Sequence, residues 1–427
     1  MLGGKRQRSY TLVWVAAVLV AAAWCVQFTA RASPGSVPRA PTSPLAAFED
    51  DAPITNGGEW MSRRAPLLRR TFLTRIYGAL PPVTPETVEY NTVDSSALNQ
   101  AARLELLTLR FEARTAPLHA ALLTPNTRGP FPLLIVSVFC GLDSDIDPRL
   151  PSPSWRPSRC RSDLGRALTE LSHGDAILHP PLQAIVARGY AVAVLYAGEV
   201  APDDPVLFRQ AQIGQLPGGQ QSGAIAAWAA LYLSAFEALR ADPRISSSRI
   251  ALWGHSRYGK AALLAAALDP RIGAVIANQS GTLGATLSSA TRGESEALLV
   301  GRFPHWFPTR SAAPDRGRSH DALDQHLLLA LLAPRPVLLG NAGLDRWSDP
   351  AASFAAARSA SDAYALFGSD GLTQGNMRFP DLAADIAFYV RPGGHGVRSS
   401  DWERALDFLD VHFASPVEPT SAAAGGV

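Results

Sequence analysis

This chain of 427 residues has few sulfur-containing side chains and a small net charge. It has three cysteines and three methionines, and 39 Lys and Arg residues nearly balance 37 Asp and Glu residues, which leaves a net charge of +2. No block of basic residues interleaved with aromatic ones occurs, which argues against nucleic acid as a partner. Glycine-rich phosphate loops, zinc-ligand spacings and dinucleotide fingerprints are absent as well, so we expect no metal and no organic cofactor.

The N-terminal segment carries the marks of export. Lys5 and Arg6 precede an apolar run over 11–26, and Ala30-Arg31-Ala32 supplies small residues at the positions that a signal peptidase reads. We therefore predict a signal peptide over 1–32 and a secreted or periplasmic protein. The alternative is an uncleaved N-terminal anchor, the one membrane contact we expect, because the apolar run is near the lower length limit for spanning a bilayer.

Composition divides the rest of the chain into a spacer, one domain and a tail. Residues 33–50 are rich in Pro, Ser and Ala, which is typical of a flexible spacer, and 414–427 is typical of a disordered tail. Between them, 51–413 has no internal repeat and is expected to form a single monomeric domain. Cys140 and Cys160 would remain after export, and either a disulfide or two buried thiols fits the sequence.

The order of apolar runs predicts the fold class. Strand-like runs occupy Arg103–Phe111, Leu118–Thr124, Phe131–Val138, Tyr190–Tyr196, Arg249–Trp253, Ile272–Ala277, Pro336–Gly340 and Ala387–Arg391. Helical patterns appear after the third run, at 218–239, 260–268 and 401–412 among others. Early strands without helices followed by alternation predict a mostly parallel central sheet with helices on both faces, the α/β-hydrolase architecture. Active residues then belong at the carboxyl ends of strands.

One short segment has the pattern of a nucleophile elbow. Ser256 lies in Gly254-His255-Ser256-Arg257-Tyr258-Gly259, between the predicted strand at 249–253 and an Ala-rich helical run at 261–268. Such a turn exposes the serine Oγ at the edge of a sheet and aims helix N–H groups at the charge formed in acyl transfer. The match to Gly-x-Ser-x-Gly is imperfect, because Tyr258 occupies the second glycine position and Gly259 comes one residue late.

The elbow and the motifs after it resemble a known family. With Lys260, the Gly-x-Ser-Arg-x-Gly-Lys pattern is similar to that of the glucuronoyl esterases, family 15 of the carbohydrate esterases. Further motifs follow in family order, namely 277–281, 292–294, 303–307, 324–326, 333–336, 340–350 and 391–395. The resemblance covers about 57–413. It implies a serine esterase that hydrolyses esters of glucuronic acid or its 4-O-methyl form, as in lignin–carbohydrate linkages of glucuronoxylan.

A serine nucleophile needs a base and a carboxylate, which follow in the order acid, histidine in this fold. His395 fits the base, since it lies in a Pro-Gly-Gly-His-Gly loop after the last predicted strand. His255 is expected to pack beside the elbow, and His305 and His326 are expected to have structural roles.

The acid is where the chain departs from the fungal pattern. The resemblance aligns a fungal Glu with Gln279, which cannot ionise and so cannot stabilise an imidazolium. Asp345 follows the predicted strand that ends at Gly340, where α/β hydrolases place the acid, and we predict that it takes this role. Asp349 is the competitor, but Pro350 and a helix follow it, which is typical of an N-cap.

Specificity is expected to come from cations and an aromatic platform. Arg257 keeps its charge in a protein, so it is a candidate for stabilising the oxyanion beside Ser256. The resemblance implies that Lys260, Glu294 and Trp347 contact the hydroxyl groups of glucuronate.

Two other functions fit the same residues. A hydrolase of acetyl or other carbohydrate esters would use the same elbow, but Lys260, Glu294 and Trp347 would then not determine the substrate. Alternatively, Gln279 in place of the usual Glu would mark an inactive hydrolase that only binds acidic glycans.

Overall fold

The structure is a computed structural model that describes residues 42–414 except 50, 113, 152, 154, 211–214, 217–219, 290 and 310–322. The predicted signal segment at 1–32 and the predicted tail beyond 414 lie outside the described residues. Within the described part, no helix combines the length and the apolar character needed to cross a bilayer.

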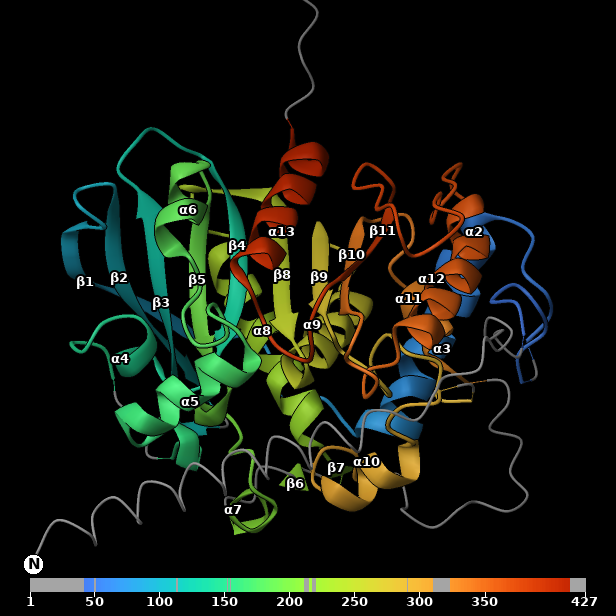
Figure 1. Ribbon diagram of the computed structural model, residues 1–427, viewed down its shortest axis with the longest axis horizontal. Coiled ribbons are helices and arrows are strands. Elements are labelled where there is room, and N and C mark those ends of the chain that lie inside the picture. The colour runs from blue at the N-terminus through green and yellow to red at the C-terminus, as the bar shows by residue number, and fades with distance from the viewer. Residues whose placement is uncertain are drawn as a thin grey trace, which may run out of the picture. The chain divides into compact units, whose positions relative to one another are not determined.

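A nine-stranded sheet forms the centre of the domain (Figure 1). Its strands in chain order are β1 (Thr87–Ala97), β2 (Ala102–Phe111), β3 (Arg114–Pro125), β4 (Phe131–Val138), β5 (Ala191–Tyr196), β8 (Ile245–His255), β9 (Ala274–Asn278), β10 (Val337–Ala342) and β11 (Ile386–Arg391). Their spatial order is β1-β2-β3-β5-β4-β8-β9-β10-β11. The pairs from β1 to β5 are antiparallel and the pairs from β5 to β11 are parallel. A separate small ribbon pairs β6 (Gln215–Leu216) with β7 (Gln220–Gln221).

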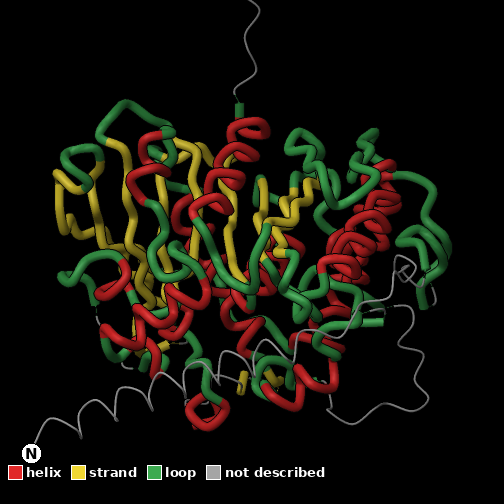
Figure 2. The backbone as a smooth tube through the Cα atoms, viewed as in Figure 1, coloured by secondary structure: helices red, strands yellow, loops and turns green. Residues whose placement is uncertain are grey.

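Helices cover the central part of the sheet, whereas the edge at β1 is mostly exposed (Figure 2). The helices before β5 are α2 (Gly57–Glu59), η1 (Trp60–Arg64), α3 (Ala65–Phe72), η2 (Leu73–Tyr77), α4 (Leu142–Asp145), η3 (Ser158–Cys160), α5 (Asp163–His173) and α6 (Leu182–Ala187). Those after it are η4 (Ala197–Glu199), α7 (Pro205–Gln210), α8 (Ala224–Leu239), α9 (Arg257–Leu268), α10 (Glu296–Arg302), α11 (Gln325–Ala330), α12 (Pro350–Ala365) and α13 (Ser399–Phe413). In Figure 1, α6 and α13 lie in front of the sheet.

Burial explains why the parallel strands read as continuous apolar runs. Every residue of β5 is buried, as are all but one of β4, so both faces of these strands are covered. Helix α8 is apolar all round and almost wholly buried, and it packs against α9 and the central strands. The α/β-hydrolase prediction is confirmed.

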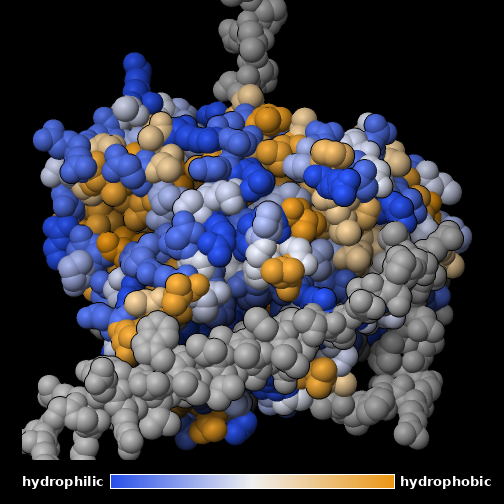
Figure 3. Space-filling model, in the orientation of Figure 1, coloured by the Kyte–Doolittle hydropathy of each residue, from blue (hydrophilic) through white to orange (hydrophobic). Residues whose placement is uncertain are grey.

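On the surface, the face drawn in Figure 3 has mostly hydrophilic residues with separate hydrophobic patches among them.

Three local expectations differ from the structure. The edge strand β1 was not predicted, because it is polar, mostly exposed and interrupted by register shifts against β2. The helix expected from 218 begins at Ala224, because Gln220–Gln221 pair with β6. Within the expected flexible spacer, residues 42–49 are packed against the domain: Phe48 is buried in the core and its backbone pairs with that of Asp51.

A disulfide links Cys140, just after β4, to Cys160 in η3. The two Cα atoms are 5.3 Å apart, and 20 positions separate the residues along the chain. Of the two arrangements that the sequence allowed, the structure therefore has the disulfide. Phe139 precedes Cys140, so the bond also fixes an aromatic ring near the elbow.

We expect the double variant Cys140→Ala/Cys160→Ala to lose about 3 kcal/mol of unfolding free energy, the amount typical of a disulfide that closes a loop of this length. Urea unfolding measures the change. Dithiothreitol should produce a similar loss in the unaltered protein and none in the double variant. Equal stability of the two proteins would contradict the prediction.

Candidate active site

The elbow has the strained backbone of a nucleophile turn. Ser256 lies between β8 and α9. Its backbone has φ 57° and ψ −123°, a conformation that residues other than glycine rarely adopt. A Cβ atom on Gly254 would lie 2.2 Å from the carbonyl oxygen of Tyr258, so this position requires glycine. A Cβ on Gly259 would lie 3.0 Å from the carbonyl oxygen of Gly254. This close approach explains why the second glycine of the elbow is found at position 259. Tyr258 packs its ring 4.8 Å from that of Phe139.

The N-terminus of α9 directly follows Ser256, its N-cap residue, and has no side-chain cap. The Ser256 N–H donates to the carbonyl of Asn278 at 2.8 Å. The first N–H groups of a helix have no partner within it, and the helix dipole favours negative charge at this end. The elbow therefore places serine beside backbone donors suited to an oxyanion.

His395 and Asp345 are in direct contact. The Nδ1 of His395 lies 2.7 Å from Oδ2 of Asp345, whose side chain is buried, whereas the histidine side chain is 30% exposed. The second oxygen of Asp345 accepts from the Ser348 N–H at 3.1 Å. The His395 ring lies 4.7 Å from that of His255, the residue before Ser256. The loop after β11 and the loop after β10 thus bring the predicted base and the predicted acid together next to the elbow.

Charge and hydrogen bonds keep Asp345 ionised. Burial alone would raise the pKa of its carboxyl group, but hydrogen bonds and charge from His395, together with hydrogen bonds from Ser348, lower the pKa below its ordinary value. Asp345 can therefore remain negative beside an imidazolium.

Gln279 and Asp349 hold the surrounding loops. Gln279 is buried with φ 50°, and its Oε1 accepts from the Gly396 N–H at 2.8 Å, directly after His395. Asp349 is the N-cap of α12, where its Oδ1 accepts from the Ala352 N–H at 3.1 Å. Its Oδ2 accepts from the Arg292 N–H at 2.6 Å. All three hydrogen bonds hold backbone segments in place, and the N-cap predicted at Asp349 is confirmed.

Arg257 lies between two aromatic rings and a carboxylate. Its guanidinium carbon lies 6.0 Å from the ring centroid of Phe139 and 5.3 Å from that of Trp306. Its Nη1 forms an ion pair with Oδ2 of Asp203. The other Asp203 oxygen accepts from Trp306 Nε1 at 2.7 Å and lies 3.1 Å from His305 Nε2. His305 is structural, as expected, but the sequence interpretation did not include Asp203.

Lys260, Glu294 and Trp347 lie near one another. The Lys260 ammonium donates to the carbonyl oxygens of Ser280 and Thr282, and burial lowers its pKa to about 8 against the opposing charge of Glu294. Burial raises the pKa of Glu294, while the charge of Lys260 lowers it. The Glu294 N–H donates to the Trp347 carbonyl at 3.0 Å, and Trp347 is 47% exposed.

The amino-acid composition also indicates that Lys260 is special, which the sequence interpretation did not use. The chain contains only two lysines, Lys5 and Lys260, and its other basic side chains are arginines. Lysine is among the residues that are almost never fully buried without partners. A chain that otherwise uses arginine and yet buries its one later lysine indicates a specific requirement for an ammonium group at this position.

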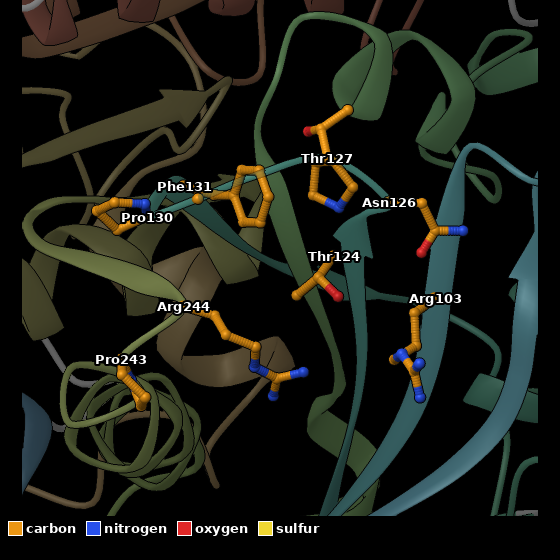
Figure 4. A pocket seen from close by; sticks show the side chains of 10 residues that line it. Arg103, Thr124, Asn126, Thr127, Pro130, Phe131, Pro243 and Arg244 are labelled. Carbon is orange, nitrogen blue, oxygen red and sulfur yellow. The ribbon is translucent and has the colours of Figure 1, made fainter.

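A cavity elsewhere in the domain lies away from these residues (Figure 4). It has a volume of about 480 Å³ and is lined by Arg103, Thr124, Pro125, Asn126, Thr127, Gly129, Pro130, Phe131, Pro243 and Arg244. Phe131 begins β4 and Arg244 immediately precedes β8, so the cavity lies at the amino ends of the parallel strands. The elbow lies at the opposite, carboxyl end.

Comparisons with known proteins show the family of this chain. A family model described as glucuronyl esterase of fungi matches residues 181–368. A carbohydrate esterase of an unknown prokaryotic organism is 30% identical over 385 residues, which cover 86% of this chain and 89% of that protein. The chain belongs to the glucuronoyl esterases, carbohydrate esterase family 15.

Solved structures of glucuronoyl esterases extend the comparison. One from Solibacter usitatus superposes with a TM-score of 0.75 at 28% identity and covers 90% of this chain and 100% of its own. A promiscuous family 15 esterase from a marine bacterial metagenome gives a TM-score of 0.75 at 29% identity, with 90% and 98% coverage. The resemblance in the motifs is thereby confirmed, and the protein is a carboxylic ester hydrolase by family.

We expect Gly254→Ala to lower kcat more than tenfold, because shifting a nucleophile by about 1 Å costs on the order of 100-fold. The added methyl would meet the Tyr258 carbonyl oxygen at 2.2 Å, so the elbow must move. Gly343→Ala is the matched control, since its Cβ meets nothing closer than 3.7 Å. Ester hydrolysis measures both variants, and wild-type kcat in Gly254→Ala would contradict the steric argument.

Proposed function

We propose that this glucuronoyl esterase hydrolyses esters of glucuronic acid or 4-O-methyl-glucuronic acid through Ser256, His395 and Asp345. The natural substrate would be the ester between a glucuronoxylan side chain and a lignin alcohol. The contact of 2.7 Å between His395 and Asp345, beside the Ser256 elbow, is the observation that carries the proposal.

The reaction would proceed through an acyl-enzyme. His395 accepts the Ser256 proton as Oγ attacks the C6 carbonyl, and Asp345 stabilises the resulting imidazolium. The oxyanion receives hydrogen bonds from the N-terminus of α9 and from Arg257. His395 then protonates the departing alcohol. Water, activated by the same histidine, attacks the acyl-enzyme and releases the uronic acid together with free Ser256.

Lys260, Glu294 and Trp347 would bind the sugar. An ammonium group has three N–H donors, and two of those of Lys260 are used by the Ser280 and Thr282 carbonyls. One donor is left for a sugar hydroxyl. Oε1 of Glu294 is buried and has no hydrogen-bond partner in the described part of the chain, so it can accept from a hydroxyl. The exposed Trp347 ring would supply an apolar surface beside them.

The same reasoning extends to location. A disulfide persists in an oxidising compartment, so the bond between Cys140 and Cys160 supports an enzyme that acts outside the cytoplasm. The N-terminal segment would direct its export, and the protein would act as a monomer.

A broader ester specificity is the second candidate. The structurally similar esterase from the marine metagenome is described as promiscuous. Parallel assays of this protein on benzyl glucuronate, methyl glucuronate and acetylated xylan separate the two functions. Preference for the glucuronate esters supports the proposal, whereas preference for acetylated xylan overturns it, and no turnover on any of the three would indicate a protein that only binds glycans.

For the catalytic residues, we expect Ser256→Ala and His395→Ala to abolish turnover and Asp345→Asn to reduce it by about 10⁴-fold, the loss typical of removing this charge from a serine hydrolase. Asp349→Asn is the matched control: it should lower stability by about 1 kcal/mol through its hydrogen bonds and leave turnover largely intact. Gln279→Ala should change turnover less than tenfold, since no charge is lost. Kinetics and thermal unfolding of each variant provide the measurements, and high activity in Asp345→Asn would remove it from the triad.

For sugar binding, the KM of benzyl glucuronate should rise as the pH passes through about 8, the pKa of Lys260. Above this pH the amine keeps only two N–H groups, which the two loop carbonyls occupy. The KM of nitrophenyl acetate should not follow this pH dependence. Lys260→Ala should weaken the glucuronate reaction by roughly 5- to 150-fold, as expected for a lost hydrogen bond of about 1–3 kcal/mol, and the acetate reaction much less.

The lysine itself can be observed directly. With ε-13C-lysine, the protein should give signals from Lys5 and Lys260 only, and one of them should titrate near pH 8. Titration of both near the ordinary value of about 10.4 would contradict the assignment.

A further inference from the structure

We infer that Asp203 is a positioning residue that orients Arg257 toward the oxyanion. The inference rests on the proposed function, in which Arg257 stabilises the charge formed on the substrate carbonyl. Asp203 itself does not touch the reacting atoms. It acts through its ion pair with Nη1 of Arg257.

The carboxylate of Asp203 is fixed by two consecutive residues, His305 and Trp306, that are distant from it in sequence. Asp203 lies between η4 and α7, after the carboxyl end of β5. Its Oδ1 is held by Trp306 Nε1 at 2.7 Å and lies 3.1 Å from His305 Nε2. The backbone of His305 is itself anchored, because its carbonyl accepts from the Ala224 N–H at 2.9 Å. Oδ1 is thereby engaged, and Oδ2 is directed at Arg257.

The rings around Arg257 leave it few alternative positions. Trp306 both donates to Asp203 and places its ring beside the guanidinium, while Phe303 stacks on Trp306 with centroids 4.0 Å apart. Phe139, held beside the disulfide, covers Arg257 as well. The Arg257 side chain is 18% exposed, so it is not wholly enclosed by these rings.

Charge gives Asp203 a role that packing alone cannot fill. A buried guanidinium without a counter-ion is strongly destabilised, so Arg257 without Asp203 would turn toward solvent or another carboxylate. An oxyanion donor contributes most when its position is fixed before the charge develops, because no reorganisation is then needed in the transition state. Asp203 thus supplies both the counter-charge and the direction.

The test is a double-mutant cycle with Asp203→Asn and Arg257→Ala in the full-length protein. Loss of one oxyanion donor costs about 100- to 1,000-fold in kcat, so a misdirected Arg257 in Asp203→Asn should cost about 10- to 100-fold, with KM nearly unchanged. In the Arg257→Ala background the same change should cost less than about threefold, because its effect passes through the arginine. Equal losses in both backgrounds, or wild-type kcat in Asp203→Asn, would overturn the inference.

Two further variants sharpen the test. Asp204→Asn is the matched control, because Asp204 accepts from the Val206 and Leu207 N–H groups at 2.9 Å and asparagine can cap α7 equally well. It should keep wild-type kcat. Trp306→Phe keeps a ring beside Arg257 and removes the donor to Asp203, so it should lower kcat severalfold only when Arg257 is present. If Asp203→Asn does not fold, this variant decides the question, and an effect independent of Arg257 would overturn the inference.

Using two substrates separates this inference from the proposed function. Both benzyl glucuronate and nitrophenyl acetate form an oxyanion, so the Asp203 effect should appear on both. Turnover of the acetate alone would reject the glucuronate proposal and still test Asp203. Wild-type kcat in Arg257→Ala on both substrates would reject the inference and leave the esterase function standing.

Discussion

The left-handed backbone of Ser256 is the constraint on which the site depends. A residue held in this region costs on the order of 1–3 kcal/mol, so it persists only where its surroundings allow no alternative. Gly254 lets the chain approach the Tyr258 carbonyl, and Tyr258 is itself buried beneath Phe139. The same turn ends β8 and begins α9, so one strained residue presents both the hydroxyl group and the uncapped helix end.

Strand pairing carries this geometry to the other members of the site. Strands β8 to β11 are neighbours and parallel, so their carboxyl ends lie along one edge of the sheet. Ala342 pairs with Arg391 at the ends of β10 and β11, and the loops that follow remain joined by a hydrogen bond of 2.9 Å from the Gly343 N–H to the Arg391 carbonyl. The contact between Asp345 and His395 therefore follows from sheet register as much as from the two side chains.

Features encoded locally could be predicted from the sequence, and contacts made between distant segments could not. The elbow, the cap at Asp349 and the strand-end positions of Asp345 and His395 each follow from a few consecutive residues. Asp203 has no such pattern: it lies between η4 and α7, its partners come from the elbow and from the segment after α10, and only the folded chain brings them together. Strand β1 escaped prediction for another reason, because a polar edge strand lacks the apolar signal on which strand prediction relies.

The hydrogen bond between Gln279 and Gly396 bears on where an acid can lie beside the histidine loop. Glutamine and glutamate have the same shape, so a single substitution would place a second carboxylate on the β9 loop, against the backbone that carries His395. Asp345 already supplies one from the β10 loop. The loop that carries His395 is therefore contacted from two directions, by position 279 after β9 and by position 345 after β10, and a carboxylate at either position would lie beside it.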